Sequence, residues 1–373
     1  MAKKIFFYSN HREDDLSIGI TKKVHAQIYE LRKRGFEVFF SAYYNKGVGI
    51  FNNQNELIEH YKIKSFNNYF GHWYRRILNL KKTENYIRKN SFSILYMRFH
   101  FWDMYSLRLL DTAKKKEIKV IVEAHTYPYY VKKSKFSYKI IYFIDKLYAK
   151  KASDYIDLVA AITESDDCVW NCKTVKIENG VNIEDVKVRN VDKIDKNVFQ
   201  IVCVANEVPL HGIPRIIYGL SKYSGSRNVV LALVGEYKKS TIELIKKLKL
   251  ENKVIIKGKL FGEELYEVYE ESSLGIGILA GYLADCHEGN VLKTKEYMAC
   301  GIPFVTSAST TAQINNFKYA YVVPEDDSAI NIDNLINFVD NLNFDAKDAE
   351  YMHNYAKNNY CWATQFDKIL YYF

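Results

Sequence analysis

The stretch HEGNVLKTKEYMACGIP places two glutamates, Glu288 and Glu296, eight residues apart with Lys293 between them. A buried-strand pattern comes before it, and VLKTKEYMAC predicts a helix that begins near Asn290. The first backbone N–H groups of a helix have no partner inside the helix and carry partial positive charge. We therefore expect an anionic ligand, such as a phosphate, at this helix start.

The two glutamates require a ligand that also donates hydrogen bonds. A carboxylate beside a phosphate is unfavourable unless it accepts hydrogen bonds, and sugar hydroxyls are suitable donors. Glu296 on a ribose and Glu288 on a hexose would meet this requirement, and Lys293 would add positive charge against a diphosphate. The simpler alternative is a solvent-exposed helix with surface Glu and Lys side chains.

Strand and helix patterns alternate along both halves of the chain. The predicted strands are 4–9, 36–43, 92–99 and 119–125, and then 199–206, 229–235, 253–258, 274–279 and 303–308. The predicted helices are 19–35, 104–117, 214–223, 241–250 and 264–273, and the helix that contains Glu296. This order indicates an α/β protein with two doubly wound, Rossmann-like domains that face a cleft. In such domains ligands bind beyond the carboxyl ends of the strands.

The length of 373 residues exceeds what one hydrophobic core usually serves, so two domains are expected. The polar stretch NVDKIDKN (190–197) is the predicted linker. We expect an N-terminal domain over 1–192 and a C-terminal domain over 193–350; the family resemblance described below implies that the first binds the acceptor and the second the nucleotide sugar. Residues 351–373 are expected to form a helical tail that packs back on the N-terminal domain.

The formal net charge of +9 favours acidic partners such as nucleotides, phospholipid headgroups or nucleic acid. Basic and aromatic residues alternate in 73–82, 86–90 and 130–153, which indicates either solvated helix faces or an interfacial membrane contact. Nucleic acid is not an expected partner, because no RNA-binding signature or zinc finger is present and glutamates mark the central site.

The sequence MAKKIFFYSN enters a strand pattern at once and shows no secretory leader, and no apolar run approaches the length of a membrane span. We expect a cytoplasmic protein, or one docked on the inner face of a membrane. The six cysteines have no zinc-site spacing, so we expect reduced thiols and no metal.

The motifs resemble those of retaining glycosyltransferases of the GT-B fold, specifically the large family 4. The resemblance starts from the pattern Glu, seven residues, Glu, followed by YMACGIPFV. Further similar segments occur in the same order over nearly the whole chain: IGITKKVHAQIYELRKRGFEV (18–38), KIENGVN (176–182), IVCVANEVPLHGIPRIIYGL (201–220) and VVLALVGEY (229–237).

This resemblance implies roles for individual residues. Glu296 would hold the ribose hydroxyls of the donor nucleotide, and Glu288 would contact the transferred sugar. Gly19 would let the backbone approach the donor diphosphate, and His125 would lie near the reacting sugar. The start of the helix would bind the diphosphate through its backbone and one lysine: Gly289, Asn290, Val291, Leu292 and Lys293.

The chain also departs from the family pattern. The family commonly has an arginine where this chain has Asn206 and Glu207, and a lysine where it has His211. His211, Arg215 or Lys293 would then have to replace the missing phosphate-binding cations. Gly289 also follows the first glutamate directly, where the family often has Phe-Gly.

The resemblance implies transfer of a sugar from a nucleotide sugar, with a UDP-sugar favoured, to a saccharide or lipid-linked acceptor. It implies retention of configuration, no cofactor and no required metal, and cell-surface polysaccharide synthesis is the expected context. Two alternatives stay open: a nucleotide-sugar epimerase of the same fold, and a degenerate GT-B protein that binds glycans or a membrane. A dinucleotide dehydrogenase is disfavoured, because GIGILAG lacks the strand–G-x-G-x-x-G–helix context.

Overall fold

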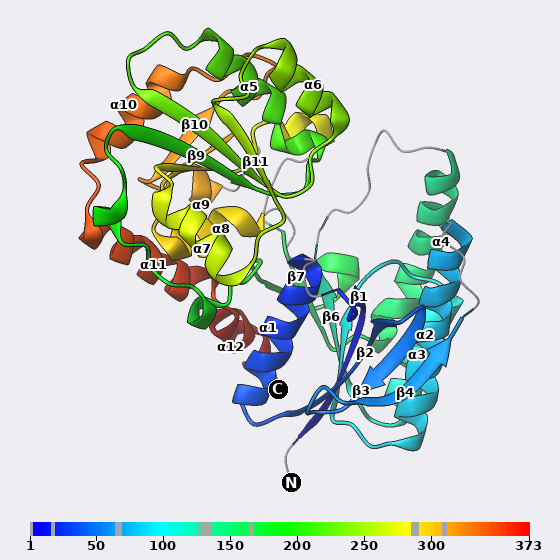
Figure 1. Cartoon of the computed structure of the whole chain (residues 1–373). Coiled ribbons are helices and arrows are strands. Elements are labelled where there is room, and N and C mark those ends of the chain that lie inside the picture. Colours follow the sequence, from blue (N-terminus) through cyan, green and yellow to red (C-terminus); the bar gives the residue numbers. More distant parts are fainter. Residues whose placement is uncertain are drawn as a thin grey trace. The chain divides into compact units, whose positions relative to one another are not determined.

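A computed structural model describes residues 3–15, 19–63, 69–125, 127, 136–163, 168–284, 291–307 and 312–373 (Figure 1). The chain forms two compact units. Unit 1 comprises Met1–Glu178 and Gln365–Phe373, and unit 2 comprises Asn179–Thr364. The residues expected as a linker, 190–197, thus fall within unit 2.

Unit 1 contains an eight-stranded sheet in the order β4-β3-β2-β1-β5-β6-β7-β8. The strands are β1 (Lys4–Arg12), β2 (Glu37–Tyr44), β3 (Gly47–Phe51), β4 (Leu57–Lys62), β5 (Ile94–Arg98), β6 (Lys119–Ala124), β7 (Leu158–Ala161) and β8 (Thr174–Lys176). From β2 to β8 all neighbours are parallel, and β3 and β4 extend one edge as antiparallel strands. Every residue of β5 is buried, as expected for a parallel strand covered on both faces.

Four long helices accompany this sheet: α1 (Gly19–Lys33), α2 (Tyr69–Lys89), α3 (Met104–Lys115) and α4 (Phe136–Ala152). The start of α3 is defined by a capping box, because the Asp103 carboxylate accepts hydrogen bonds from the backbone N–H groups of Tyr105 and Ser106, while the Ser106 hydroxyl reaches back to the Asp103 N–H. The α3 residues Leu109, Leu110 and Ala113 pack in one core with apolar residues of β1, β5 and β6.

The end of the chain belongs to unit 1. In α12 (Trp362–Leu370) the Gln365 side chain accepts a hydrogen bond of 2.9 Å from the backbone N–H of Glu178. The Phe366 ring lies 5.9 Å from the Tyr96 ring, centroid to centroid. These contacts hold the last residues of the chain against β5 and the end of the first segment.

Unit 2 contains a six-stranded parallel sheet in the order β11-β10-β9-β12-β13-β14. Its strands are β9 (Val198–Val204), β10 (Asn228–Val234), β11 (Val254–Gly258), β12 (Leu274–Ile276), β13 (Phe304–Ser307) and β14 (Ala320–Val323). Its helices are α5 (Ile213–Lys222), α6 (Lys239–Lys247), α7 (Gly262–Glu271), α8 (Leu292–Cys300), α9 (Ala312–Asn315), α10 (Ile332–Leu342) and α11 (Ala346–Tyr360). Two doubly wound α/β units confirm the predicted fold class.

The strand order defines where a ligand can bind in each unit. In unit 2 the chain runs outward from β9 to β11 and then returns to β12 on the other side of β9, so the order reverses between β9 and β12. In unit 1 it reverses between β1 and β5. Ligands of open α/β sheets bind at such switch points, beyond the carboxyl ends of the strands.

None of the helices in the described part of the chain combines the length and the apolar character that a bilayer crossing requires.

Candidate functional site

The helix α8 lies at the switch point of unit 2 and is fixed against β9. The Tyr297 hydroxyl accepts a hydrogen bond of 3.2 Å from the Val204 N–H and donates one of 3.4 Å to the Val202 carbonyl. Gly275 in β12 makes this packing feasible, since an added Cβ would lie 2.6 Å from the Tyr297 ring. The sequence thus places the first turn of α8 beyond the end of β9.

Lys293 is a buried cation in the first turn of α8. Its side chain is 6% exposed, and its Nζ lies 3.9 Å from the Cys203 Sγ at the end of β9. Burial lowers the pKa of Lys293. Among the described residues no carboxylate forms an ion pair with it, and a buried charge without a partner is costly in a protein interior. An anionic ligand at the start of α8 would supply a counter-charge.

His211 is buried beside Lys293, in the short helix Pro209–His211 that follows β9. Burial, with the nearby Lys293 charge, lowers the pKa of His211 to about 3. His211 is therefore neutral at physiological pH and can exchange hydrogen bonds with a ligand but adds no charge. Lys293 supplies the positive charge at this position.

Arg215 is engaged with backbone oxygens. Its guanidinium donates hydrogen bonds to the carbonyls of Ser328 at 2.8 Å and Pro324 at 3.0 Å, and to that of Leu279. It also pairs with the Asp326 carboxylate at 3.1 Å. These contacts join the segments after β12 and β14 to α5 and favour a structural role, so its use as a phosphate-binding cation stays a prediction.

Asn206 and Glu207 follow β9 and bind the neighbouring β10 segment. The Asn206 side-chain oxygen accepts a hydrogen bond of 3.0 Å from the Glu236 N–H. The Glu207 carboxylate accepts hydrogen bonds from the Lys238 N–H at 2.8 Å and the Thr241 hydroxyl at 2.9 Å. Asn206 and Glu207, which occupy the position of an arginine in the family pattern, therefore connect the loop after β9 to the loop after β10.

Glu296 lies one turn after Lys293 in α8 and is partly buried. The Cys300 thiol has a raised pKa, chiefly through burial and further through the Glu296 charge.

The described helix begins at Leu292, two residues later than predicted, and is preceded by Val291 in an extended conformation. Three predicted site residues lie outside the described residues: Glu288, Gly289 and Asn290.

In unit 1, His125 directly follows β6, as the sequence predicted for a strand-end residue. Burial lowers the pKa of His125 to about 3, and the Arg98 guanidinium acts in the same direction. The imidazole is therefore neutral and suited to hydrogen bonding with an uncharged hydroxyl. Gly19 is the first residue of α1 and has open space around an added Cβ, so its approach to a diphosphate stays a prediction.

A buried ionic network surrounds Glu123, which lies in β6 two residues before His125. The Glu123 carboxylate, with no exposed surface, pairs with the Lys23 Nζ at 2.9 Å and with the Arg98 Nε at 3.4 Å. It also accepts hydrogen bonds from the Gln27 amide at 2.6 Å and the Tyr96 hydroxyl at 2.9 Å. Sequence reasoning missed this network, although a glutamate inside the apolar strand KVIVEAH was a visible signal.

Solved structures resemble the chain over almost its full length. Sucrose-phosphate synthase from Thermosynechococcus elongatus has a TM-score of 0.70 and 14% identity, with 99% of this chain and 98% of that chain covered. HepE of Anabaena in complex with UDP has a TM-score of 0.66 and 14% identity, with 99% and 98% covered. WaaG, a glycosyltransferase involved in lipopolysaccharide biosynthesis, has a TM-score of 0.66 and 15% identity, with 97% and 98% covered.

The chain has the GT-B fold. Within it, residues 186–359 match the family model described as Glycosyl transferases group 1. No curated protein sequence matches the chain. The matched segment contains Lys293, Glu296 and His211, whereas His125 lies in the other GT-B domain and outside the match.

Proposed function

We propose that this GT-B protein is a retaining glycosyltransferase that moves a sugar from a nucleotide sugar to a saccharide or lipid-linked acceptor. The observation that carries the proposal is Lys293, a buried cation without a described carboxylate partner at the first turn of α8. A donor diphosphate would complete this arrangement, because it brings negative charge to a helix start and a lysine. The match of residues 186–359 to the group 1 family model supports the same donor side.

In the proposed reaction the bond between the sugar and the diphosphate breaks through an oxocarbenium-like state. Negative charge grows on the leaving diphosphate, and we propose that Lys293 and the N–H groups at the start of α8 stabilise it. Glu296 accepts hydrogen bonds from the ribose, and neutral His125 hydrogen-bonds the transferred sugar, as the family resemblance implies. As the family resemblance implies, we propose that this step requires no metal or cofactor.

A UDP-sugar is the favoured donor. HepE, which shares the fold, has been solved with UDP, with UDP and glucose, and with UDP-glucose. We therefore expect uridine nucleotides to be the first ligands to test.

The donor assignment predicts ligand-dependent stability that Glu296→Ala removes. A ligand at about 100 times its Kd adds about 2.7 kcal/mol to the free energy of unfolding, which raises Tm by several degrees. We expect this shift with UDP or a UDP-sugar in the wild type and a much smaller shift in Glu296→Ala, because the ribose loses its acceptor. Glu264→Ala, at an exposed position in α7, is the matched control and should keep the full shift. An equal shift in Glu296→Ala and wild type would refute the ribose assignment.

Measurement of turnover distinguishes the proposed transferase from the two alternative functions, an epimerase and a degenerate binding protein. A glycosyltransferase releases the nucleotide diphosphate in proportion to an added acceptor, whereas an epimerase converts the nucleotide sugar without one. A degenerate binding protein would show the Tm shift with neither reaction.

An apolar surface on unit 1 supports a lipid-linked acceptor and peripheral membrane contact. Phe143, Ile144 and Leu147 on α4 are 65%, 39% and 55% exposed. They lie near the exposed lysines of the same helix: Lys146, Lys150 and Lys151. A helix with exposed apolar side chains and neighbouring lysines is typical of contact with an anionic membrane surface.

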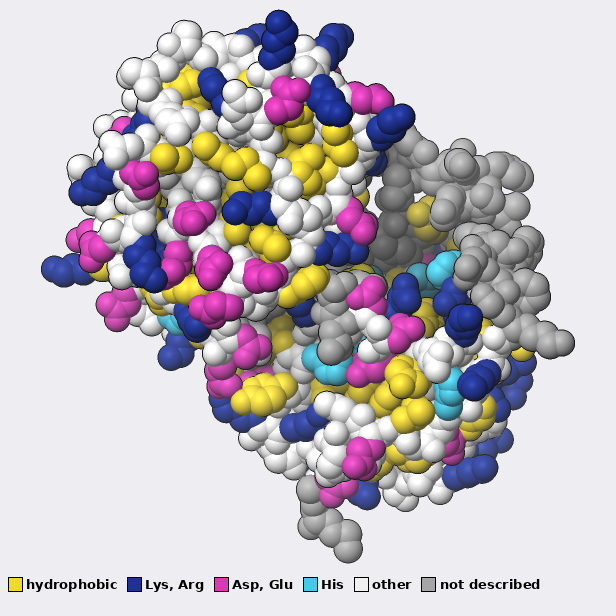
Figure 2. Space-filling view, viewed as in Figure 1, with side chains coloured by type: hydrophobic (Ala, Val, Ile, Leu, Met, Phe, Trp, Pro, Cys, Tyr) yellow, Lys and Arg dark blue, Asp and Glu magenta, His cyan; other side chains and the backbone are white. Residues whose placement is uncertain are grey.

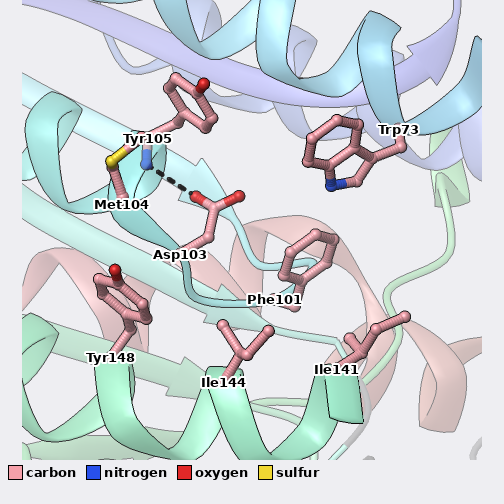
Figure 3. Close-up of a pocket in the computed structure, with 8 residues that line it drawn as sticks. All are labelled: Trp73, Phe101, Asp103, Met104, Tyr105, Ile141, Ile144 and Tyr148. Carbon is pink, nitrogen blue, oxygen red and sulfur yellow. Dashed lines mark hydrogen bonds between the residues drawn. The ribbon is translucent and has the colours of Figure 1, made fainter. Parts of the chain in front are cut away.

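A cavity of about 390 Å³ adjoins this helix. Figure 3 shows Ile141, Ile144 and Tyr148 of α4 facing Phe101 and Trp73 across it. The acid in its wall, Asp103, is paired with Arg76 at 2.5 Å and caps α3, so the cavity presents mainly apolar side chains. Such a cavity would accept the apolar part of a lipid-linked acceptor.

Charge distribution argues against a nucleic-acid partner. On the face shown in Figure 2, basic and acidic side chains are interspersed over both units. A phosphate backbone requires a continuous basic surface, which this face does not present, and we propose nucleotide and membrane partners to account for the net charge of +9.

Replacement of Phe143 and Leu147 by glutamate is expected to abolish binding to anionic vesicles. Two apolar side chains that would be buried in the lipid would be lost, and two negative charges would be added beside the negatively charged lipid surface. Co-sedimentation with vesicles of phosphatidylglycerol and phosphatidylcholine measures the bound fraction. Tyr218→Glu, at a 44% exposed position in α5, is the control and should leave binding unchanged. Equal binding of all three proteins would exclude α4 as the membrane contact.

A further inference from the structure

Two histidines and a glutamate converge at the end of β1, outside the proposed donor site. The Glu13 Oε2 lies 2.9 Å from the His11 Nε2 and 2.9 Å from the His25 Nε2. The three ligand atoms lie within 4.8 Å of one another. His11 is in β1, Glu13 directly follows this strand and His25 is in α1.

The backbone around the three residues is held in place. The Thr21 hydroxyl of α1 donates a hydrogen bond of 3.0 Å to the Arg12 carbonyl, and the Glu13 N–H donates one of 2.9 Å to the Tyr43 carbonyl in β2. Both histidine rings pack near the Phe40 ring, with centroid distances of 6.0 and 6.1 Å. The three side chains are therefore positioned by rigid elements before any ligand binds.

The cluster is buried on one side and accessible on the other. The His11 side chain has no exposed surface, Glu13 is 11% exposed and His25 is 26% exposed. An ion could thus enter past His25 and keep one coordination position open to solvent.

We propose that His11, Glu13 and His25 bind one Zn²⁺ ion. Two imidazole nitrogens and one carboxylate oxygen are a typical ligand set of zinc sites with an open fourth position. Bond lengths of about 2.0–2.1 Å place tetrahedral ligand atoms about 3.3 Å apart, so the two separations of 2.9 Å from the Glu13 oxygen need to widen only slightly. The spacing of Glu13 and His25, twelve residues apart, matches no short zinc motif, which explains why the sequence predicted no metal.

The protonation state of His11 is compatible with this ligation. Its Nδ1 is buried and has no hydrogen-bond partner among the described residues, so the Glu13 carboxylate alone determines which ring nitrogen carries the proton. Without metal, both Nε2 atoms donate to Glu13. Zn²⁺ would displace these two protons, and the ring proton would reside on Nδ1.

The charged side chains around the three proposed ligands are also compatible with a bound cation. Two arginines act on the cluster: Arg98, which is already paired with Glu123, acts on His11, and Arg32 acts on Glu13. Glu13 supplies the local negative charge and accepts hydrogen bonds from both histidines. A bound ion would tie α1 to the sheet at the switch point of unit 1, independently of donor binding in unit 2.

Metal titration tests the proposal on the full-length protein after treatment with a chelator. We expect one Zn²⁺ per chain in competition with a chromophoric chelator, and one Co²⁺ per chain with the intense visible bands of tetrahedral coordination. His25→Ala and Glu13→Gln should each weaken Zn²⁺ binding more than about tenfold and remove the Co²⁺ bands. His72→Ala removes an exposed histidine of α2 and should leave both measurements unchanged.

Zn²⁺ should also raise Tm of the wild type and of His72→Ala but not of His25→Ala. Because His25 is on the surface of α1, His25→Gln serves as a second variant of similar shape, and circular dichroism verifies that each variant is folded. Stoichiometry well below one, or equal affinity in wild type and the folded His25 variants, would overturn the proposal and leave a metal-free hydrogen-bonded triad.

Discussion

Replacement of Glu123 by glutamine is expected to lower the free energy of unfolding of unit 1 by about 3–5 kcal/mol, because it leaves buried cations without their counter-charge. Glu123 has no exposed surface and compensates both Lys23 and Arg98. The amide can keep some hydrogen bonds but carries no negative charge. A loss of this size is a large part of the stability of an ordinary domain.

Denaturant unfolding followed by tryptophan fluorescence measures this effect, since three of the four tryptophans, Trp73, Trp102 and Trp170, belong to unit 1. The matched control is Glu37→Gln, which removes a surface pair with Lys4 at 3.3 Å. This exposed pair should contribute less than about 1 kcal/mol. If both variants lost the same small amount, the buried network would not be a determinant of stability.

The same network makes a pH-dependent prediction. Burial alone would raise the pKa of Glu123, but Lys23, Arg98 and the hydrogen bonds of Gln27 outweigh it and hold the pKa far below the ordinary value of 4.5. The unfolded chain therefore binds a proton near pH 4.5 while the folded chain does not. The stability difference between wild type and Glu123→Gln should be constant above this pH and shrink as the pH falls below it.

The α/β architecture could be predicted from the sequence because local patterns encode it. Alternation of apolar strands and amphipathic helices identified β1, β2, β5 and β6 and the helices α1 and α3. The pattern did not give the strand order or the antiparallel β3–β4 edge. The turn before β3 uses Asn45 and Lys46 with positive φ; asparagine often adopts this conformation but lysine rarely does, so Asn-Lys is a weaker turn signal than Asn-Gly.

The candidate site was predictable where its residues are close in sequence. Lys293 and Glu296 share one helix, so their spacing and the helix start indicated a ligand. Arg215 was ranked as a phosphate-binding candidate because its partners, 64 to 113 residues away, cannot be recognised without the fold. The Glu123 network and the His11, Glu13 and His25 cluster were missed for the same reason, since each depends on tertiary contacts between α1 and the sheet.

Replacement of Lys293 by methionine is expected to lower kcat/KM for sugar transfer by about 10²–10³-fold, as for loss of one group that stabilises the charge developing in the transition state. Methionine keeps a long unbranched side chain but removes a buried charge that no described carboxylate compensates. The free variant should therefore be at least as stable as wild type, because burial of an unpaired charge opposes folding. Loss of activity with retained or increased Tm would separate a role in binding and catalysis from a structural role.

Lys295→Met is the matched control for Lys293→Met, because it changes a second buried lysine of the same helix. Lys295 points elsewhere, with its Nζ 4.6 Å from the centre of the Tyr360 ring in α11. We expect Lys295→Met to keep the Tm increase with the donor nucleotide and Lys293→Met to lose it. Equal nucleotide binding in both variants would mean that the buried charge of Lys293 does not face the diphosphate, and the α8 N–H groups would then have to carry that role without it. Loss of nucleotide binding in Lys293→Met alone would show that the helix start and this lysine act together. The two would then replace the arginine and lysine of the family pattern, whose positions are occupied here by Asn206, Glu207 and His211.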